Sequence, residues 1–428
     1  MLTHIEKQTN RFQTVSEKLP EVVFTWLRKP LFGSNFYYTS EEGLVNFNQT
    51  KAFSPNGPNI VQVYTDHELS YPFRLFRYYN LVPFINGRED YFTKNRDEKD
   101  GVARFVGGTG VDFSTRFYRT LDYQGKPFGI EINQLRHVFE PIVQYDAIKF
   151  ATVDPGELVV TGRGDQLDHR DILTFGMENR IQTKRKTRKG GIQRVDLVSF
   201  NAFLDYSFGP GSRLLRTQAN KFTEARFETI LRPYDWLAFR VDSVYDMLDY
   251  HISTNNTDAI FDPGRFHITL SHRYTKDRSK DSRSVDNLEV APPHLISNET
   301  GTDHQLTVDV VYDLNKRWDL GAYARWRISD ERLEEWEIRA TRDLHDWLFD
   351  FGYNVRNSDR TDAESEMNKE FFAQLRLKAV PDIQVKTGHR ASFIDSRIGR
   401  TVSGSNEAPS PSVFSIAPDA QYGSLSAS

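Results

Sequence analysis

Apolar and polar residues alternate with a period of two along the C-terminal half of the chain. Between residues 306 and 314 the even positions are apolar, whereas the odd positions include Asp309 and Asp313. The same alternation returns in 318–328 and in 347–356. Because successive side chains of a β-strand point to opposite faces, each segment predicts a strand with one apolar and one charged face. These strands follow one another closely, which is typical of an antiparallel β-barrel that crosses a membrane.

Strand signals of this kind extend over most of the chain, between turn clusters such as 54–58 and polar loops such as 88–100 and 153–171. The expected fold class is all-β, an antiparallel transmembrane β-barrel of roughly 16–18 strands, most of them long enough to cross a bilayer. Two of these strands are expected to meet near Glu140 and Pro141. Very short turns alternate with loops of more than about 20 residues, as periplasmic turns and outside loops do.

The chain divides into three expected parts: a polar N-terminal segment (1–18), the barrel domain (19–400) and a disordered tail rich in Ser, Pro, Ala and Gly (401–428). The polar start has no apolar signal-peptide core. We therefore expect the sequence to be a fragment of a longer protein, and its barrel to be partial and to lack N-terminal strands.

Composition narrows the class further. The net charge of −4 gives no overall field that would recruit nucleic acid, and the absence of cysteine excludes disulfides and thiolate metal sites. Mean hydropathy is −0.59 and no apolar run approaches the length of a transmembrane helix, but a barrel hides its lipid face in every second residue. The 31 Phe, 19 Tyr and 6 Trp residues would form aromatic girdles at the two membrane interfaces.

Five short motifs occur in a fixed order along the chain. They are LPEVVF at 19–24, GVDFSTRFYR at 110–119, LRHVFEP at 135–141, FGMENRIQTKR at 175–185 and RPYDWL at 232–237. Together with the segments around 30–38, these motifs resemble those of the LptD (OstA) family, the lipopolysaccharide-assembly proteins of the bacterial outer membrane. The resemblance extends over about residues 19–393 and places the chain in the C-terminal part of such a protein.

The resemblance implies transport without bond chemistry, so neither a catalytic residue nor a cofactor is expected. Acyl chains of lipopolysaccharide would leave through a lateral seam in the barrel wall, while its sugars pass through the polar lumen. The implied partners are lipopolysaccharide, an LptE-like lipoprotein plug and a periplasmic LptA-like bridge, which would act through an N-terminal β-jellyroll domain missing here. The chain departs from the family in lacking cysteines and in ending on Ser426-Ala427-Ser428 rather than on an aromatic residue.

Two sets of side chains are candidate contacts. The first set is expected to face the lumen: Asp309, Arg325, Arg327 and Asp350. The second set is the basic loop, which could meet anionic headgroups or lipopolysaccharide phosphates or be a plain solvated turn: Lys184, Arg185, Lys186, Arg188 and Lys189. The histidines show no metal-ligand spacing, so no metal site is expected.

Three other interpretations remain open. A porin or another outer-membrane barrel transporter shares every compositional feature and lacks only the motifs. A water-soluble β protein would pack its apolar faces against each other. A barrel enzyme such as an outer-membrane lipase would need a Ser/His pair on neighbouring strands, which the sequence does not reveal.

Overall fold

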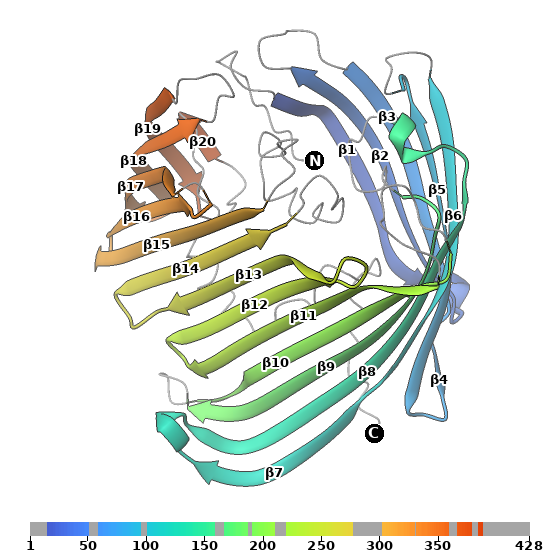
Figure 1. Cartoon of the computed structure of the whole chain (residues 1–428), viewed down its shortest axis with the longest axis horizontal. Coiled ribbons are helices and arrows are strands. Elements are labelled where there is room, and N and C mark those ends of the chain that lie inside the picture. The colour runs from blue at the N-terminus through green and yellow to red at the C-terminus, as the bar shows by residue number, and fades with distance from the viewer. Residues whose placement is uncertain are drawn as a thin grey trace.

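The strands of this chain form one continuous antiparallel sheet that curves around an open interior (Figure 1). The computed structural model describes residues 15–50, 59–95, 101–158, 167–186, 191–209, 220–276, 302–329, 331–358, 366–378 and 384–387. No helix in these ranges is long and apolar enough to span a membrane.

The strands are β1 (Val15–Pro30), β2 (Tyr37–Thr50), β3 (Asn59–Ser70), β4 (Phe73–Leu75), β5 (Tyr79–Phe92), β6 (Val102–Thr115), β7 (Phe117–Gly125), β8 (Ile132–Ala151), β9 (Arg170–Lys186), β10 (Ile192–Ser207), β11 (Lys221–Tyr234), β12 (Leu237–Asp246), β13 (His251–Phe261), β14 (Phe266–Thr275), β15 (Asp303–Asn315), β16 (Trp318–Arg327), β17 (Arg332–Leu344), β18 (Trp347–Ser358), β19 (Glu366–Leu377) and β20 (Gln384–Thr387). Three short 3₁₀ turns join some of them: η1 (Leu31–Gly33), η2 (Pro127–Gly129) and η3 (Pro155–Glu157).

The sheet runs up and down, and each strand except β3 and β6 pairs with the strand that follows it. Strands β3 and β4 pair with successive parts of β5 in the same register, so together they make one crossing of the sheet. Strands β6 and β7 pair with β8 in the same way. The 20 strands therefore make 18 passes, which confirms the expected all-β antiparallel barrel architecture. Within the described residues, β1 pairs with β2 alone and β20 with β19 alone. Strand β20 is described over Gln384–Thr387.

The two faces of the sheet have opposite chemistry, and the charged face is the buried one. Leu306, Leu320 and Trp326 share one face and are exposed, whereas Asp309 and Arg325 on the other face are buried. A water-soluble β protein shows the reverse arrangement, because its apolar side chains form the core. The sheet therefore has the chemistry of a barrel whose apolar face meets lipid and whose polar face lines a lumen. By register, the remaining outward-facing residues expected from the alternation share the exposed face: Val308, Val310, Tyr312, Trp318, Phe349 and Phe351.

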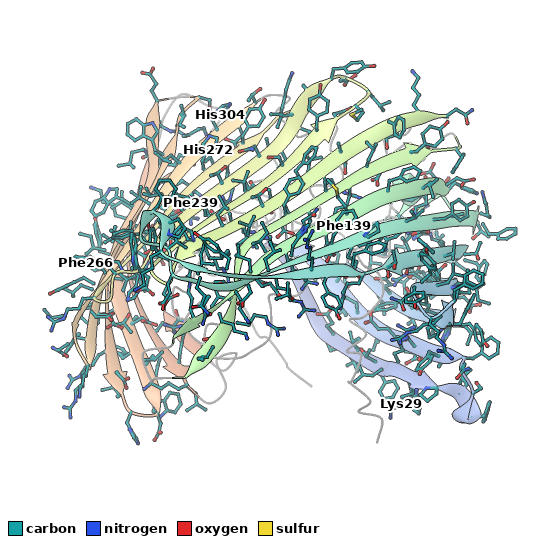
Figure 2. All side chains as sticks on the ribbon, turned by 90° about the horizontal axis from the view of Figure 1, so that it is seen from below. Lys29, Phe139, Phe239, Phe266, His272 and His304 are labelled. Carbon is teal, nitrogen blue, oxygen red and sulfur yellow. The ribbon has the colours of Figure 1, made fainter. Side chains whose placement is uncertain are left out.

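Aromatic side chains gather at both ends of the lipid-facing surface. On β11, Phe222 packs against Tyr206 at one end and Tyr234 stacks on Trp236 at the other, with ring centroids 5.1 and 4.8 Å apart. About twelve residues separate these two aromatic contacts, or roughly 40 Å along a strand. At the usual tilt near 45° this length spans roughly 28 Å, which matches the apolar band of an outer-membrane barrel. Figure 2 shows Phe266 and His304 at the two opposite ends of the sheet.

The connections differ systematically between the two ends. At one end, two-residue turns join β11 to β12, β15 to β16 and β17 to β18. At the other end, the long connections 152–169, 208–220 and 276–302 join β8 to β9, β10 to β11 and β14 to β15. In outer-membrane barrels short turns face the periplasm and long loops face the exterior. The end with the two-residue turns is therefore the periplasmic end, and the end with the long connections is the exterior end.

Three boundaries differ from the sequence prediction. Residues 88–92 belong to β5 rather than to a charged loop, because Arg88 and Asp90 pair on the lumen face. Strand β1 begins at Val15, inside the segment that was expected to precede the barrel. Strand β8 continues through Pro141, where two strands were expected to meet. Pro141 lies opposite the break between β6 and β7, a position where a missing backbone donor interrupts little.

Candidate functional site: the charged lumen wall

The densest charged surface of the lumen wall lies on β15 to β19. The register places Arg325 beside Glu335, and Glu335 beside Arg356, so opposite charges meet directly across neighbouring strands. Three of the four residues expected to face the lumen, Asp309, Arg325 and Asp350, are buried on this face, and Arg327 is half-buried beside them. The alternation that predicts the strands thus also brings these side chains together.

A β-bulge in β17 adds a carboxylate that the simple alternation misses. The register shifts between Arg325 and Trp326, so that Glu334 is an extra residue and both it and Glu335 point into the lumen. Arg325 bridges the two acids: Nε lies 3.2 Å from Glu334 and Nη2 lies 3.2 Å from Glu335. Nη2 of Arg327 lies 2.5 Å from Oε1 of Glu334, so this carboxylate is held between two arginines. The sequence signal for the bulge is the spacing of three, rather than two, between the apolar residues Leu333 and Trp336.

Arg339 reaches across an entire strand. Its cross-strand neighbour on β16 is Gly321, and its guanidinium passes over that glycine to Asp309 on β15, where Nη2 lies 2.9 and 3.0 Å from the two carboxylate oxygens. A Cβ atom at position 321 would lie 2.6 Å from Arg339 Nε. Gly321 therefore leaves the room through which Arg339 reaches Asp309, a role that the sequence alone does not reveal.

Replacing Gly321 with valine is expected to destabilise the barrel by roughly 1–3 kcal/mol, because the new side chain overlaps Arg339 and displaces it from Asp309. The measurement is the urea midpoint of unfolding of the protein in lipid vesicles. Ala322→Val is the matched control, because Ala322 is the next residue of β16 and lies exposed on the lipid face. Equal midpoints for the two variants would contradict the steric role of Gly321.

The remaining acids of this wall also have partners. Asp350, fully buried, accepts hydrogen bonds from Thr341 Oγ1 at 2.6 Å and Arg376 Nε at 2.7 Å. Glu335 Oε1 accepts from Asn354 at 2.9 Å and from Arg356 at 3.0 Å. In the described ranges no three His, Asp or Glu side chains gather as metal ligands. The wall offers charge-assisted hydrogen bonds of both signs, and the arrangement suits weak, distributed contacts with a polar solute.

In the basic loop, Arg185 is engaged by groups of the protein itself. Arg185 is buried, and its Nη1 lies 3.0 Å from Asp235 while Nη2 donates to the carbonyl oxygens of Arg232 and Pro233. It therefore anchors the β11–β12 turn rather than offering a free cation to phosphate. Lys184 is exposed and donates to Gln134 at 2.6 Å, and Lys186 ends β9. Arg188 and Lys189 lie outside the described residues. The loop joins β9 to β10 at the short-turn, periplasmic end.

Four of the five sequence motifs contact one another in this part of the sheet. Arg116 of the second motif forms an ion pair with Glu140 of the third at 2.7 Å. His137 of the third motif lies 3.3 Å from Asn179 of the fourth. Arg185 of the fourth motif pairs with Asp235 of the fifth, as described above. The motifs therefore contact one another through three separate pairs of side chains.

Comparison with known proteins gives similarity to solved structures only. No protein-family model and no curated protein matches the chain. Similar solved structures include the FrpB iron transporter from Neisseria meningitidis, with a TM-score of 0.37, 9% identity, and 83% of this chain and 64% of that one covered. For the siderophore receptor PirA from Acinetobacter baumannii the TM-score is 0.37 and the identity 7%, with 86% of this chain and 64% of that one covered. For the alcaligin receptor FauA from Bordetella pertussis the TM-score is 0.30 and the identity 12%, with 85% of this chain and 63% of that one covered.

The chain covers less than two thirds of the length of each of these barrels, and at such identities the similarity concerns the fold alone. The sheet itself has four features of a membrane barrel. Its exposed face is apolar with aromatic residues at both ends, its buried face is charged, and short turns lie at the end opposite the long loops. These observations identify the described chain as the wall of a bacterial outer-membrane β-barrel.

Proposed function

We propose that this barrel transports lipopolysaccharide to the outer leaflet of the outer membrane. The observation that carries the proposal is the ordered set of motifs that resemble the LptD family; four of the five contact one another through three separate pairs, Arg116–Glu140, His137–Asn179 and Arg185–Asp235.

In this proposal the two faces of the sheet serve the two halves of the cargo. The lumen wall of β15–β19 carries acids and arginines in alternation, so sugars and phosphates can exchange weak hydrogen bonds along it without being trapped. The apolar face keeps the barrel in the membrane, where acyl chains would join the lipid through a seam. An LptE-like lipoprotein in the lumen and a periplasmic LptA-like bridge complete the proposed pathway.

Site-specific photocrosslinking in cells tests this function. Ser199 and Asn201 of β10 face the lumen. Ala202, the residue after Asn201, faces lipid, so a photocrosslinker there reports background contact with the membrane. We expect lipopolysaccharide adducts at Ser199 and Asn201 during transport, and loss of those adducts when lipopolysaccharide synthesis is stopped. Adducts at Ala202 alone, together with normal surface lipopolysaccharide after depletion of the protein, would refute the proposal.

The second candidate is a porin-like or other barrel transporter with no role in lipopolysaccharide assembly. It is favoured by the ion pairing of the lumen wall, because Arg325, Arg339 and Arg356 are already engaged by carboxylates. A wall of this kind suits small polar solutes that need no row of cations. The negative crosslinking result would leave this candidate standing.

A further inference from the structure

Strand β7 has a strand partner on one edge only. It pairs with β8 from Phe117 to Gly125, whereas on its other side β5 ends at Tyr79, which lies opposite Thr115. The β7–β8 hairpin therefore continues past the end of β5, and in the described part of the chain no strand pairs with the other edge of β7. In Figure 1 β7 runs along the lower border of the sheet with β8 directly above it. Such an edge leaves the backbone N–H and C=O groups of every second residue without a strand partner.

The side chains of β7 leave this edge accessible. Phe117 and Leu121 project from one face and Tyr118 from the other, and all three are exposed. Proline, lysine or a very short length normally protects an edge strand against added strands. The sequence of β7, FYRTLDYQG, is nine residues long and contains neither proline nor lysine. Its one irregularity lies between Leu121 and Gln124, so residues 117–121 form a regular, unprotected edge.

Side-chain contacts hold the β7–β8 hairpin in place at both ends. At its base, Arg116 forms an ion pair with Glu140 at 2.7 Å. At its tip, Tyr234 at the end of β11 donates a hydrogen bond to the carbonyl oxygen of Phe128 at 2.6 Å. The second contact places the tip beside the β11–β12 turn, at the periplasmic end of the sheet. An edge held in this way loses little conformational freedom on binding, which favours the addition of a strand.

Arg119 gives the edge a charge preference. It lies on the same face as Phe117 and Leu121, between the two, and within the described residues it is exposed and forms no ion pair. Residues directly opposite each other on neighbouring strands share a face, where opposite charges stabilise and like charges destabilise. A matching strand therefore has an acidic residue between two apolar residues, at every second position. A second copy of β7 fits poorly, because the antiparallel register that pairs Phe117 with Leu121 sets Arg119 against Arg119.

We propose that the free edge of β7, over residues 117–121, is a docking site for an extended segment of a periplasmic protein. The segment adds to the sheet as a further strand and carries the apolar, acidic, apolar alternation on the face that it shares with Arg119. Backbone hydrogen bonds along the edge supply affinity in this mode of recognition, and the alternating side chains supply specificity. The proposal does not depend on the identity of the cargo.

The test measures binding of fluorescein-labelled peptides to the full chain in lipid nanodiscs by fluorescence anisotropy. One peptide is Thr-Phe-Thr-Glu-Thr-Leu-Thr, and the other has lysine in place of glutamate. Arg119→Glu should weaken binding of the glutamate peptide roughly fivefold or more and strengthen binding of the lysine peptide by a similar factor. Arg74→Glu is the matched control, because Arg74 is exposed on β4, which lies on the far side of β5 from β6. It should bind both peptides as the parent does.

Amide hydrogen exchange separates strand addition from contact between side chains alone. The glutamate peptide is expected to slow exchange of alternate amides within residues 117–121 and to leave exchange in β12 unchanged. Failure of the parent to bind the glutamate peptide, equal affinities of the parent and Arg119→Glu for both peptides, or unchanged exchange in β7 on binding would overturn the proposal. Slow exchange of all these amides before any peptide is added would also overturn it, because the edge would already be covered by the chain itself or by a second copy.

Discussion

Replacing Glu335 with glutamine is expected to lower the free energy of unfolding of the barrel by about 3 kcal/mol. Glu335 has no exposed surface and holds Arg325, Arg356 and Asn354. Removing one partner of a buried ion pair leaves the other charge uncompensated, which costs about 3–5 kcal/mol. We place the effect at the lower end of that range, because Arg356 is 27% exposed to water and Arg325 keeps Glu334.

A double-mutant cycle measures this effect. Urea unfolding in vesicles is compared for Glu335→Gln, Arg356→Gln and the double variant. Because the double variant removes both charges, it should be more stable than the sum of the single effects predicts, with a coupling of about 1 kcal/mol or more. Purely additive effects would show that water in the lumen screens the pair and that the buried network is not a source of stability.

Replacing Leu270 with arginine should impair membrane assembly far more than replacing its neighbour Thr269 with arginine. Leu270 lies in the middle of β14, faces lipid and is 46% exposed, so a charge there would cost about 2–4 kcal/mol. Thr269 points into the lumen and lies directly across from Asp309, so an arginine there gains a carboxylate neighbour. An arginine is therefore expected to be strongly harmful at one position and tolerated at the position next to it.

The measurement is the fraction of each variant that reaches the folded, heat-modifiable form in the outer membrane. We expect little folded Leu270→Arg and near-parental amounts of Thr269→Arg. Similar folded fractions for the two variants would argue against the assignment of the two faces.

The fold could be predicted from sequence wherever the alternation is regular. Along β15, β16 and β18 every second residue is apolar, and a period of two specifies both the strand and the face that each side chain takes. Asp309, Arg325 and Asp350 could be assigned to the lumen for the same reason. The prediction failed where a local signal was overridden: Pro141 reads as a strand end, but the sheet tolerates it at the break between β6 and β7.

The partners of the lumen residues could not be predicted, because they depend on register between strands. Glu334 joins the lumen only through a bulge, and Arg339 reaches Asp309 only because Gly321 leaves room on the strand between them. Arg185 reads as part of a solvated basic turn, yet it is buried against Asp235, about 50 residues later in the chain. Contacts over such sequence separations carry no periodic signal.

The burial of Leu158, which follows β8, was equally hidden. Residues 153–171 read as a polar loop because they are rich in Asp and Gly, and Leu158 begins only a short apolar run, 158–160, within them. Its burial depends on Ile60 and Phe92, which come from strands far earlier in the chain.

The central claim is that one face of this sheet meets lipid and the other lines a lumen. The most direct test places a single cysteine at each position from Leu306 to Tyr312, labels it with an environment-sensitive fluorophore, and measures quenching by spin-labelled lipids and by a water-soluble quencher. We predict quenching by lipid at 306, 308, 310 and 312 and by the aqueous quencher at 307, 309 and 311, in strict alternation. Aqueous quenching at all seven positions, or quenching without a period of two, would contradict the claim.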